Sequence, residues 1–225
     1  MATAVKDKPR RDYRTKDGTR VPGVTTVLGN LGWKTPGLVI WSFREGQKHP
    51  ELSTPYEITE EAAGIGTVVH RAVELVMHGA PTAEAEAHIR ETLAEDQWDR
   101  AESSLLGFYR WRDSSQVEVV DTEVALVSEL GFGGTIDYVA RVGGVLSILD
   151  LKTSKAVYGD MLVQVAAYGR LWTEHHPDQP ISDYYILRID KESAGFDYAY
   201  RSGLTEAWDV FRACLTIHQL KRVVR

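Results

Sequence analysis

Two aspartates are predicted to meet across a β-hairpin in the middle of the chain. Gly143 and Gly144 lie between two apolar runs and predict a two-residue hairpin loop. Residues that pair across this loop have numbers adding up to 287, which places Asp137 opposite Asp150. Opposed residues have Cβ atoms roughly 4.5–5.5 Å apart, so the two carboxylates would repel each other. Because buried unpaired charge is costly, a positive charge should lie between them.

That positive charge could come from Lys152 or from a divalent cation. Lys152 is two residues beyond Asp150 and therefore on the same face of the strand, and the register places it opposite Thr135. Carboxylate oxygens suit Mg²⁺ or Mn²⁺. Together, a cation that polarises a phosphoryl oxygen and a lysine that offsets charge would make a hydrolytic site. On spacing alone, a surface hairpin with an ordinary Asp–Lys ion pair explains the same pattern.

Two predicted helices add polar pairs spaced by one turn. His70 and Glu74 share a face with Gly66 on a helix over residues 59–77. This pair could bind zinc, but there is no second histidine in HExxH spacing, and a lone histidine on such a face is also typical of a core position. Gln164 and Tyr168 lie on the helix that follows the Asp150 strand. Alone, they are ordinary polar residues of a helix surface.

Hydrophobic periodicity predicts the elements that position these residues. The chain begins with helices, continues with a β-meander, and ends with a helix, two strands and a helix, which is typical of an α/β or α+β domain. The predicted helices are 24–28, 36–45, 59–77, 82–95, 97–113, 158–176 and 204–222, and the predicted strands are 117–127, 133–142, 145–153, 183–189 and 196–200.

Composition bounds the class of protein. The 225 residues include 43% hydrophobic and 26% charged residues, which is typical of a soluble globular domain with a full core. No apolar run approaches the roughly 20 residues of a membrane span, and the N-terminus lacks the apolar core of a signal peptide. Cys214 is alone, so an intrachain disulfide and a four-cysteine cluster are excluded. These features predict a cytoplasmic protein with no membrane partner.

Four segments, read in order, resemble the signature motifs of RecB-type nucleases in the PD-(D/E)xK superfamily. They are GTVVH (66–70), GTIDYVA (134–140), LDLKT (149–153) and QVAAY (164–168). VPGVTTVL (21–28) is similar to the opening of small single-strand exonucleases of the phage and mitochondrial-genome-maintenance type. The resemblance implies a restriction-endonuclease-like α/β (α+β) core, in which helices flank a central mixed β-sheet, with a helical N-terminal part.

The resemblance also implies roles for individual residues. His70, Asp137, Asp150 and the carbonyl of Leu151 would bind one or two Mg²⁺ or Mn²⁺ ions, and Lys152 would be the catalytic lysine. The cysteine count leaves no iron–sulfur cluster of the kind that some relatives carry.

The resemblance implies supporting roles for four further residues near the metal ligands. Gln164 and Tyr168 would orient the site and touch the DNA. Glu123 matches an acidic position of the first strand, although a solvated strand residue explains it equally well. Glu74 would at best contact the residues that bind the metal, without binding the metal itself.

Under this interpretation the whole chain is a single nuclease domain. Residues 1–12 would be a flexible basic tail, residues 13–115 a mainly helical N-terminal part, and residues 116–225 the catalytic α/β core.

The net charge of −6 argues against a nucleic-acid partner until it is divided along the chain. Residues 1–48 carry +6, residues 49–130 carry −12, and residues 131–225 carry no net charge. DNA is therefore predicted to enter along the basic first segment and to avoid the acidic helices. The expected phosphate contacts are Arg14, Lys16, Arg20, Lys34 and Arg44, preceded by Arg10 and Arg11, and Trp33 is expected to stack on a base.

The leading hypothesis is a metal-dependent DNA exonuclease that acts on single strands or free ends in replication, recombination or repair, in a bacterium or a phage-infected host. The alternatives are a catalytically inactive nuclease-like module that binds DNA or a partner, a structure-dependent or nicking endonuclease on the same fold, and a zinc hydrolase built on His70 and Glu74. No motif identifies a partner helicase or recombinase, a digestion polarity or an oligomeric state.

Overall fold

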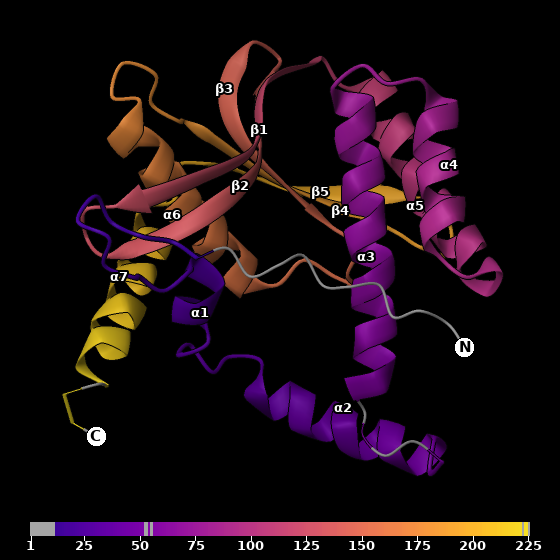
Figure 1. Ribbon diagram of the computed structural model, residues 1–225, viewed down its shortest axis with the longest axis horizontal. Coiled ribbons are helices and arrows are strands. Elements are labelled where there is room, and N and C mark those ends of the chain that lie inside the picture. Colours follow the sequence, from indigo (N-terminus) through magenta and orange to yellow (C-terminus); the bar gives the residue numbers. More distant parts are fainter. Residues whose placement is uncertain (1–11, 52–53, 55, 222, 225) are drawn as a thin grey trace.

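A computed structural model describes residues 12–51, 54, 56–221 and 223–224 of the chain (Figure 1). The predicted flexible tail over residues 1–12, with Arg10 and Arg11, therefore lies outside the described residues except for Asp12. The described part forms α1 (Val24–Leu28), α2 (Thr35–Lys48), α3 (Tyr56–Met77), α4 (Thr82–Thr92), α5 (Glu95–Ser114), β1 (Val117–Ser128), β2 (Phe132–Val142), β3 (Val145–Lys152), α6 (Gly159–His175), β4 (Asp183–Ile189), β5 (Phe196–Ser202) and α7 (Thr205–Leu220).

The element order agrees with the sequence prediction, and the main correction concerns the start of α3. The predicted cap Thr59 lies inside the helix, which begins at Tyr56. The helix thus begins three residues before Thr59. Its first turn is preceded by a hydrogen bond of 3.3 Å from the backbone N–H of Thr54 to Oε1 of Glu57, which is half of a capping box. The other end is as predicted, because Gly79 has φ +85° and closes the helix after Met77.

The five strands form one mixed sheet in the order β1-β2-β3-β4-β5 (Figure 1). The first three strands are an antiparallel meander, as predicted, β3 and β4 are parallel, and β5 returns antiparallel to β4. Because parallel neighbours need a crossover, α6 connects β3 to β4 over one face of the sheet. The site residues at the end of β3 therefore have α6 close by.

Two hydrophobic clusters cover the two faces of the sheet. One cluster contains Ile136, Ile148 and Ile186 of the sheet and packs against α1, α6 and α7. The other contains Leu149 and Leu151 of the same sheet and packs against α3, α4 and α5. Successive residues of β3 thus face different helical layers, as the pleat requires, and Figure 1 shows the two groups of helices on either side of the strands.

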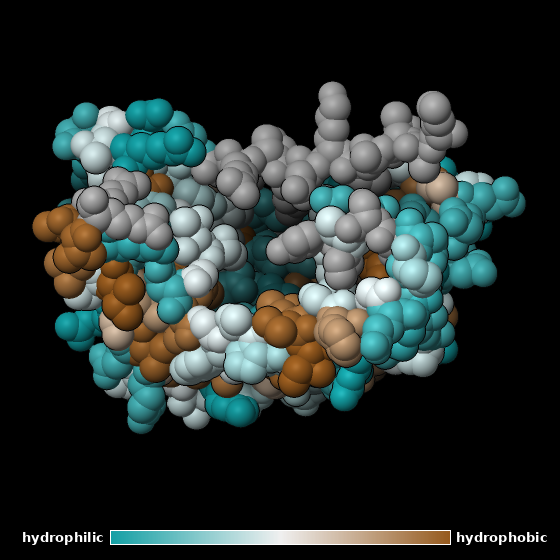
Figure 2. Space-filling model, turned by 90° about the horizontal axis from the view of Figure 1, so that it is seen from below, coloured by the Kyte–Doolittle hydropathy of each residue, from teal (hydrophilic) through white to brown (hydrophobic). Residues whose placement is uncertain are grey.

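Helix α2 stands apart from both clusters. It contributes no buried residue, and Leu38, Val39, Ile40 and Phe43 are each more than half exposed. Seen from below, the molecule has a central hollow with a hydrophilic floor, and brown apolar atoms lie on its lower rim (Figure 2). Within the described part of the chain, no helix has both the length and the apolarity to cross a membrane.

Candidate active site

The β2–β3 hairpin has the predicted register. The paired residues run from Val142 with Val145 to Tyr138 with Leu149, and the pairing stops there. On its other edge, β3 pairs with the parallel strand β4 from Ser147 to Lys152, while the residues of β2 before Tyr138 pair only with β1. The regular β2–β3 ladder therefore ends one pair before the two predicted acids.

The partner predicted for Lys152 lies beyond the end of that ladder. Thr135 pairs with Ala125 of β1, and its hydroxyl is 2.8 Å from the hydroxyl of Tyr13. The ring of Tyr13 lies over Gly133, where a Cβ atom would come within 2.5 Å of it. This close contact fixes the chain before α1 against the start of β2.

Asp137 lies at a break in the pleat of β2. Ile136 belongs to the cluster under α6, whereas Tyr138, two residues later, belongs to the cluster under α3. Such a break re-aims a side chain. Oδ2 of Asp137 accepts the backbone N–H of Leu151 at 3.3 Å and lies 3.7 Å from Nδ1 of His70. Asp137 thereby connects β2, β3 and α3.

Asp150 is the buried acid of the group. It is completely inaccessible to solvent, and Nζ of Lys152 lies 2.5 Å from its Oδ2. Apart from this ion pair, neither carboxylate oxygen accepts a hydrogen bond from the described residues. Burial raises the pKa of Asp150 to about 7. The attraction of Lys152 lowers this pKa in part, and the repulsion of Asp137 raises it further. The carboxylate therefore lacks part of the positive surroundings that its charge requires.

Lys152 keeps its proton in this group. Burial by itself would lower the pKa of the ammonium, but the attraction of Asp150 and Asp137 outweighs burial and raises it. The two acids therefore favour the cationic form of the lysine. It can orient an anionic oxygen and offset charge that develops on a phosphorus.

The polar pair on α6 adjoins the two acids. Nε2 of Gln164 donates a hydrogen bond of 2.8 Å to the hydroxyl of Tyr168. Burial, followed by the negative charges of Asp150 and Asp137, raises the pKa of Tyr168 well above its ordinary value, so the hydroxyl stays protonated. The ring is buried against Gly134, where a Cβ atom would come within 2.9 Å of it. Gly134 thus lets α6 approach β2.

Two further acids lie near Asp137. Glu123 has φ +51° in the middle of β1, in the left-handed region that non-glycine residues avoid. Its neighbours in β1 pair with Tyr138 and Ile136, so the ladder places it opposite Asp137. Glu74 forms an ion pair of 2.8 Å with Arg71. Both glutamates contribute to raising the pKa of Tyr138 after burial, which places their charges on this side of the sheet.

Most of the chain matches a known protein family. The family model of the PD-(D/E)XK nuclease superfamily matches residues 40–215, which is most of the chain. The chain belongs to the PD-(D/E)XK nuclease superfamily. No curated protein sequence matches it.

Solved structures resemble this nuclease only distantly. A proposed exonuclease from Eubacterium rectale has 14% identity and a TM-score of 0.46, over 72% of this chain and 66% of the other. This chain thus spans just under two thirds of that protein. LHK-Exo in complex with dAMP has 14% identity and a TM-score of 0.30, over 69% of this chain and 91% of the other.

The predicted DNA contacts of the nuclease fall into two groups. Arg14 and Arg20 both form ion pairs with Asp12, at 2.6 and 2.8 Å. Lys34 forms an ion pair of 2.6 Å with Asp160, and its Nζ lies 5.1 Å from the ring centroid of Tyr158. These three cations already have acidic partners. The other predicted contacts, Lys16, Arg44 and Trp33, are exposed, and 57% of the surface of Trp33 is accessible.

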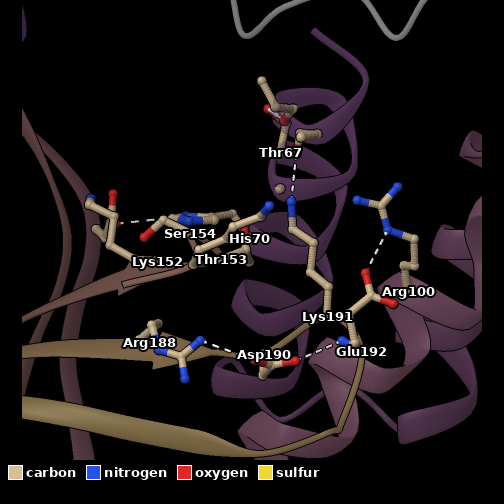
Figure 3. Close-up of a pocket in the computed structure, with 15 residues that line it drawn as sticks. Thr67, His70, Arg100, Lys152, Thr153, Ser154, Arg188, Asp190, Lys191 and Glu192 are labelled. Carbon is tan, nitrogen blue, oxygen red and sulfur yellow. Dashed lines mark hydrogen bonds and ion pairs between the residues drawn. The ribbon is translucent and has the colours of Figure 1, made fainter. Parts of the chain in front are cut away.

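A cavity of about 630 Å³ beside the acids brings in residues that the sequence prediction missed. It is lined by His70, Asp137 and Lys152, and also by Thr67 of α3, Ser154 and Lys155 after β3, Arg100 of α5, and Arg188, Asp190, Lys191 and Glu192 at the end of β4 (Figure 3). A sequence signal did exist, because the run Arg-Ile-Asp-Lys over 188–191 directly follows the most buried part of β4.

Gly66 sets the distance between α3 and the active-site strand. A Cβ atom at this position would lie 2.9 Å from Oγ1 of Thr153, one residue beyond Lys152. We therefore expect Gly66→Ala to shift α3 with His70 and to lower nuclease activity by about 10–100-fold, since small displacements of positioned groups are costly. Initial rates of DNA digestion measure the effect. Thr153→Ala in the same chain should recover part of the loss.

Gly46→Ala is the matched control, because no atom lies within 4 Å of a Cβ atom there. It should leave the rate unchanged. Equal losses in Gly66→Ala and Gly46→Ala would show that the contact with Thr153 does not position the site.

Proposed function

We propose that this nuclease is a divalent-metal-dependent DNA exonuclease acting on single strands or free DNA ends. The observation that carries the proposal is the completely buried carboxylate of Asp150, which lies beside Asp137 and, apart from its ion pair with Lys152, accepts no hydrogen bond from the described residues. A fold that buries Asp150 beside the partly exposed Asp137, at the edge of a cavity, needs additional positive charge there. In a nuclease, a bound divalent metal ion can supply it.

The donors at this position suit Mg²⁺ or Mn²⁺. The carboxylates of Asp137 and Asp150 and the carbonyl of Leu151 are hard oxygen ligands, and His70 lies beside them. Among the described residues, no group of three or more His, Cys, Asp or Glu side chains is arranged to hold a metal, and the ammonium of Lys152 already lies against Asp150. Binding would therefore require the lysine to turn from Asp150 towards the substrate.

Each residue has a definite task in such a reaction. When bound, a divalent cation polarises the phosphoryl oxygen and makes water a stronger nucleophile. Lys152 holds a proton next to the phosphate oxygens and offsets the charge that develops on them. Tyr168, kept protonated and oriented by Gln164, can donate a hydrogen bond, and the backbone N–H of Leu151 holds Asp137 in place.

Digestion of end-labelled DNA tests the proposal. Single- and double-stranded DNA, labelled separately at the 5′ and 3′ ends, should be degraded with Mg²⁺ or Mn²⁺ and should survive intact in EDTA. The order in which the labels are released gives the polarity. Covalently closed circular single strands should resist digestion, and their cleavage would favour an endonuclease on the same fold. Binding of DNA without any digestion, in every metal tested, would favour an inactive DNA-binding module.

Salt dependence tests where DNA binds. If the exposed residues Lys16 and Arg44 of the basic segment contact phosphates, affinity for single-stranded DNA should fall steeply with salt, with a slope of about −0.7 per phosphate contact. The double variant Lys16→Met with Arg44→Met should show a shallower slope by fluorescence anisotropy. Arg212→Met is the control, because this arginine is exposed on α7 and pairs with Asp209 at 3.4 Å. A double variant with the slope of the wild type would remove the basic segment from the DNA path.

A further inference from the structure

Lys191 is a partly buried lysine, two residues after the end of β4, whose ammonium contacts a neutral group. Its Nζ donates a hydrogen bond of 2.8 Å to the backbone carbonyl of Ala62 in α3. Within the described part of the chain, no carboxylate lies within ion-pair distance of this ammonium. Burial, followed by the repulsion of Arg100, lowers the pKa of Lys191 to about 8, against the weaker attraction of Glu192 and Glu61. Lys191 is therefore a partly desolvated cation that forms no direct ion pair with a described residue.

The neighbouring cations are different, because their own acids neutralise them. Arg188 forms ion pairs with Asp190 at 3.2 Å and with Asp197 at 2.8 Å. Arg100 forms ion pairs with Glu61 and with Glu192. The two acids nearest to Lys191 in the chain are thus engaged by arginines, and Figure 3 shows Lys191 directed away from them towards α3.

The backbone holds Lys191 in place before any ligand arrives. Oδ1 of Asp190 accepts the backbone N–H groups of Glu192 and Ser193 at 2.8 and 3.0 Å, which fixes the turn after β4. Lys191 lines the same cavity as His70 and Lys152. We call Asp137, Asp150 and Lys152 the hydrolytic group. A preorganised cation that has no direct ion pair and shares a cavity with this group is suited to bind an anion.

We propose that Lys191 binds a phosphate group of the DNA strand other than the phosphate that is cut. The proposal rests on the proposed nuclease function and names a second phosphate site in the same cavity. The ammonium of Lys191 would donate a hydrogen bond to a charged phosphate oxygen. It would do so either in place of its hydrogen bond to the carbonyl of Ala62 or in addition to it. The phosphate could be an internal diester or a terminal monoester, which share this chemistry.

Binding in EDTA tests the site without turnover. We would measure the affinity of a short single-stranded oligonucleotide with 5′-hydroxyl and 3′-hydroxyl ends over a range of salt concentrations. If the bound phosphate is an internal diester, Lys191→Met should weaken binding of this oligonucleotide at least tenfold and make the slope of log affinity against log salt shallower by about 0.7, which is one phosphate contact on a single strand. Lys191→Arg keeps the charge and should keep most of the affinity. Lys221→Met, exposed at the end of α7, should behave like the wild type.

The same oligonucleotide with a 5′- or 3′-phosphate identifies the source of the anion. An equal loss for all three oligonucleotides indicates an internal diester, and a loss confined to one phosphorylated end indicates a terminal monoester. Either result supports the site.

Thermal unfolding separates a ligand role from a structural one. Without DNA, Lys191→Met should melt at the same or a higher temperature, since it removes a partly buried charge. A lower melting temperature with unchanged DNA affinity and salt slope would mean that Lys191 only ties β4 to α3, and would overturn the proposal. The binding result is independent of hydrolysis. Wild-type protein that binds DNA through Lys191 but digests none would contradict only the nuclease proposal.

Discussion

Asp150→Asn is expected to reduce DNA hydrolysis by about 10³-fold or more while the fold is kept. The carboxylate is completely buried at the hydrolytic group, and the metal that it would hold supplies several kcal/mol of transition-state stabilisation. Asparagine has nearly the same shape and retains one carbonyl oxygen, but it has no charge to attract a cation. Mg²⁺ should therefore raise the melting temperature of the wild type and not that of the variant.

The same substitution should have a pH-dependent effect on stability in EDTA. The pKa of Asp150 is about 7 in the folded protein and near 3.8 in the unfolded chain, so the folded state binds more protons between these values. The contribution of Asp150 to the free energy of unfolding is then fully present below pH 4. This contribution is lost as the pH rises through about 7. Between pH 4 and pH 8, the wild type should lose roughly 2–4 kcal/mol relative to Asp150→Asn.

Urea unfolding of both proteins at several pH values, together with initial digestion rates, measures these effects. Asp178→Asn is the matched control, because Asp178 is exposed in the loop after α6 and lies far along the chain from the site. It should leave the rate and the pH dependence unchanged. A stability difference between wild type and Asp150→Asn that does not change with pH would mean that the buried carboxylate is already satisfied in the metal-free protein.

Lys152→Met is expected to lower the hydrolysis rate by about 10²–10³-fold, which is the loss typical of removing one preorganised group that stabilises developing charge. The affinity for DNA in EDTA should change much less, because the effect belongs to the transition state. The substitution also takes the cation from beside the buried Asp150, and this should raise the pKa of that carboxyl further.

Single-turnover digestion and anisotropy in EDTA separate the two effects of Lys152→Met. Lys221→Met controls for the loss of one positive charge. The double variant Asp150→Asn with Lys152→Met should be no slower than the slower single variant, since both residues act in one group. A rate for Lys152→Met within threefold of the wild type would remove the lysine from the reaction.

Much of the β2–β3 hairpin could be predicted because its geometry is local. Gly143 and Gly144 have φ +58° and +86°, so they form the tight turn that only one register of the flanking strands satisfies. The observed pairs follow that register as far as Tyr138 and Leu149, directly before Asp137 and Asp150. The i, i+4 spacing likewise places Gln164 and Tyr168 one helical turn apart, within reach of the hydrogen bond that the structure shows.

Two contacts within short stretches of the chain were not predicted from the sequence. Asp12 forms ion pairs with Arg14 and Arg20, which charge counting assigned to DNA, and an isolated β-bridge pairs the two arginines. Helix α3 begins three residues before the predicted cap Thr59, because the side chain of Glu57 accepts the backbone N–H of Thr54.

The pattern of residue types thus determined the order of elements and the hairpin register, since each depends on neighbours within a turn or a hairpin, and from these it predicts that Asp137, Asp150 and Lys152 lie together. Only the tertiary structure decided that the regular β2–β3 ladder ends before Asp137, and that Lys191 reaches Ala62 across 129 residues of sequence. The reason is physical. Local hydrogen-bond geometry is set by adjacent residues, whereas the burial and pairing of a charge depend on which elements pack against it.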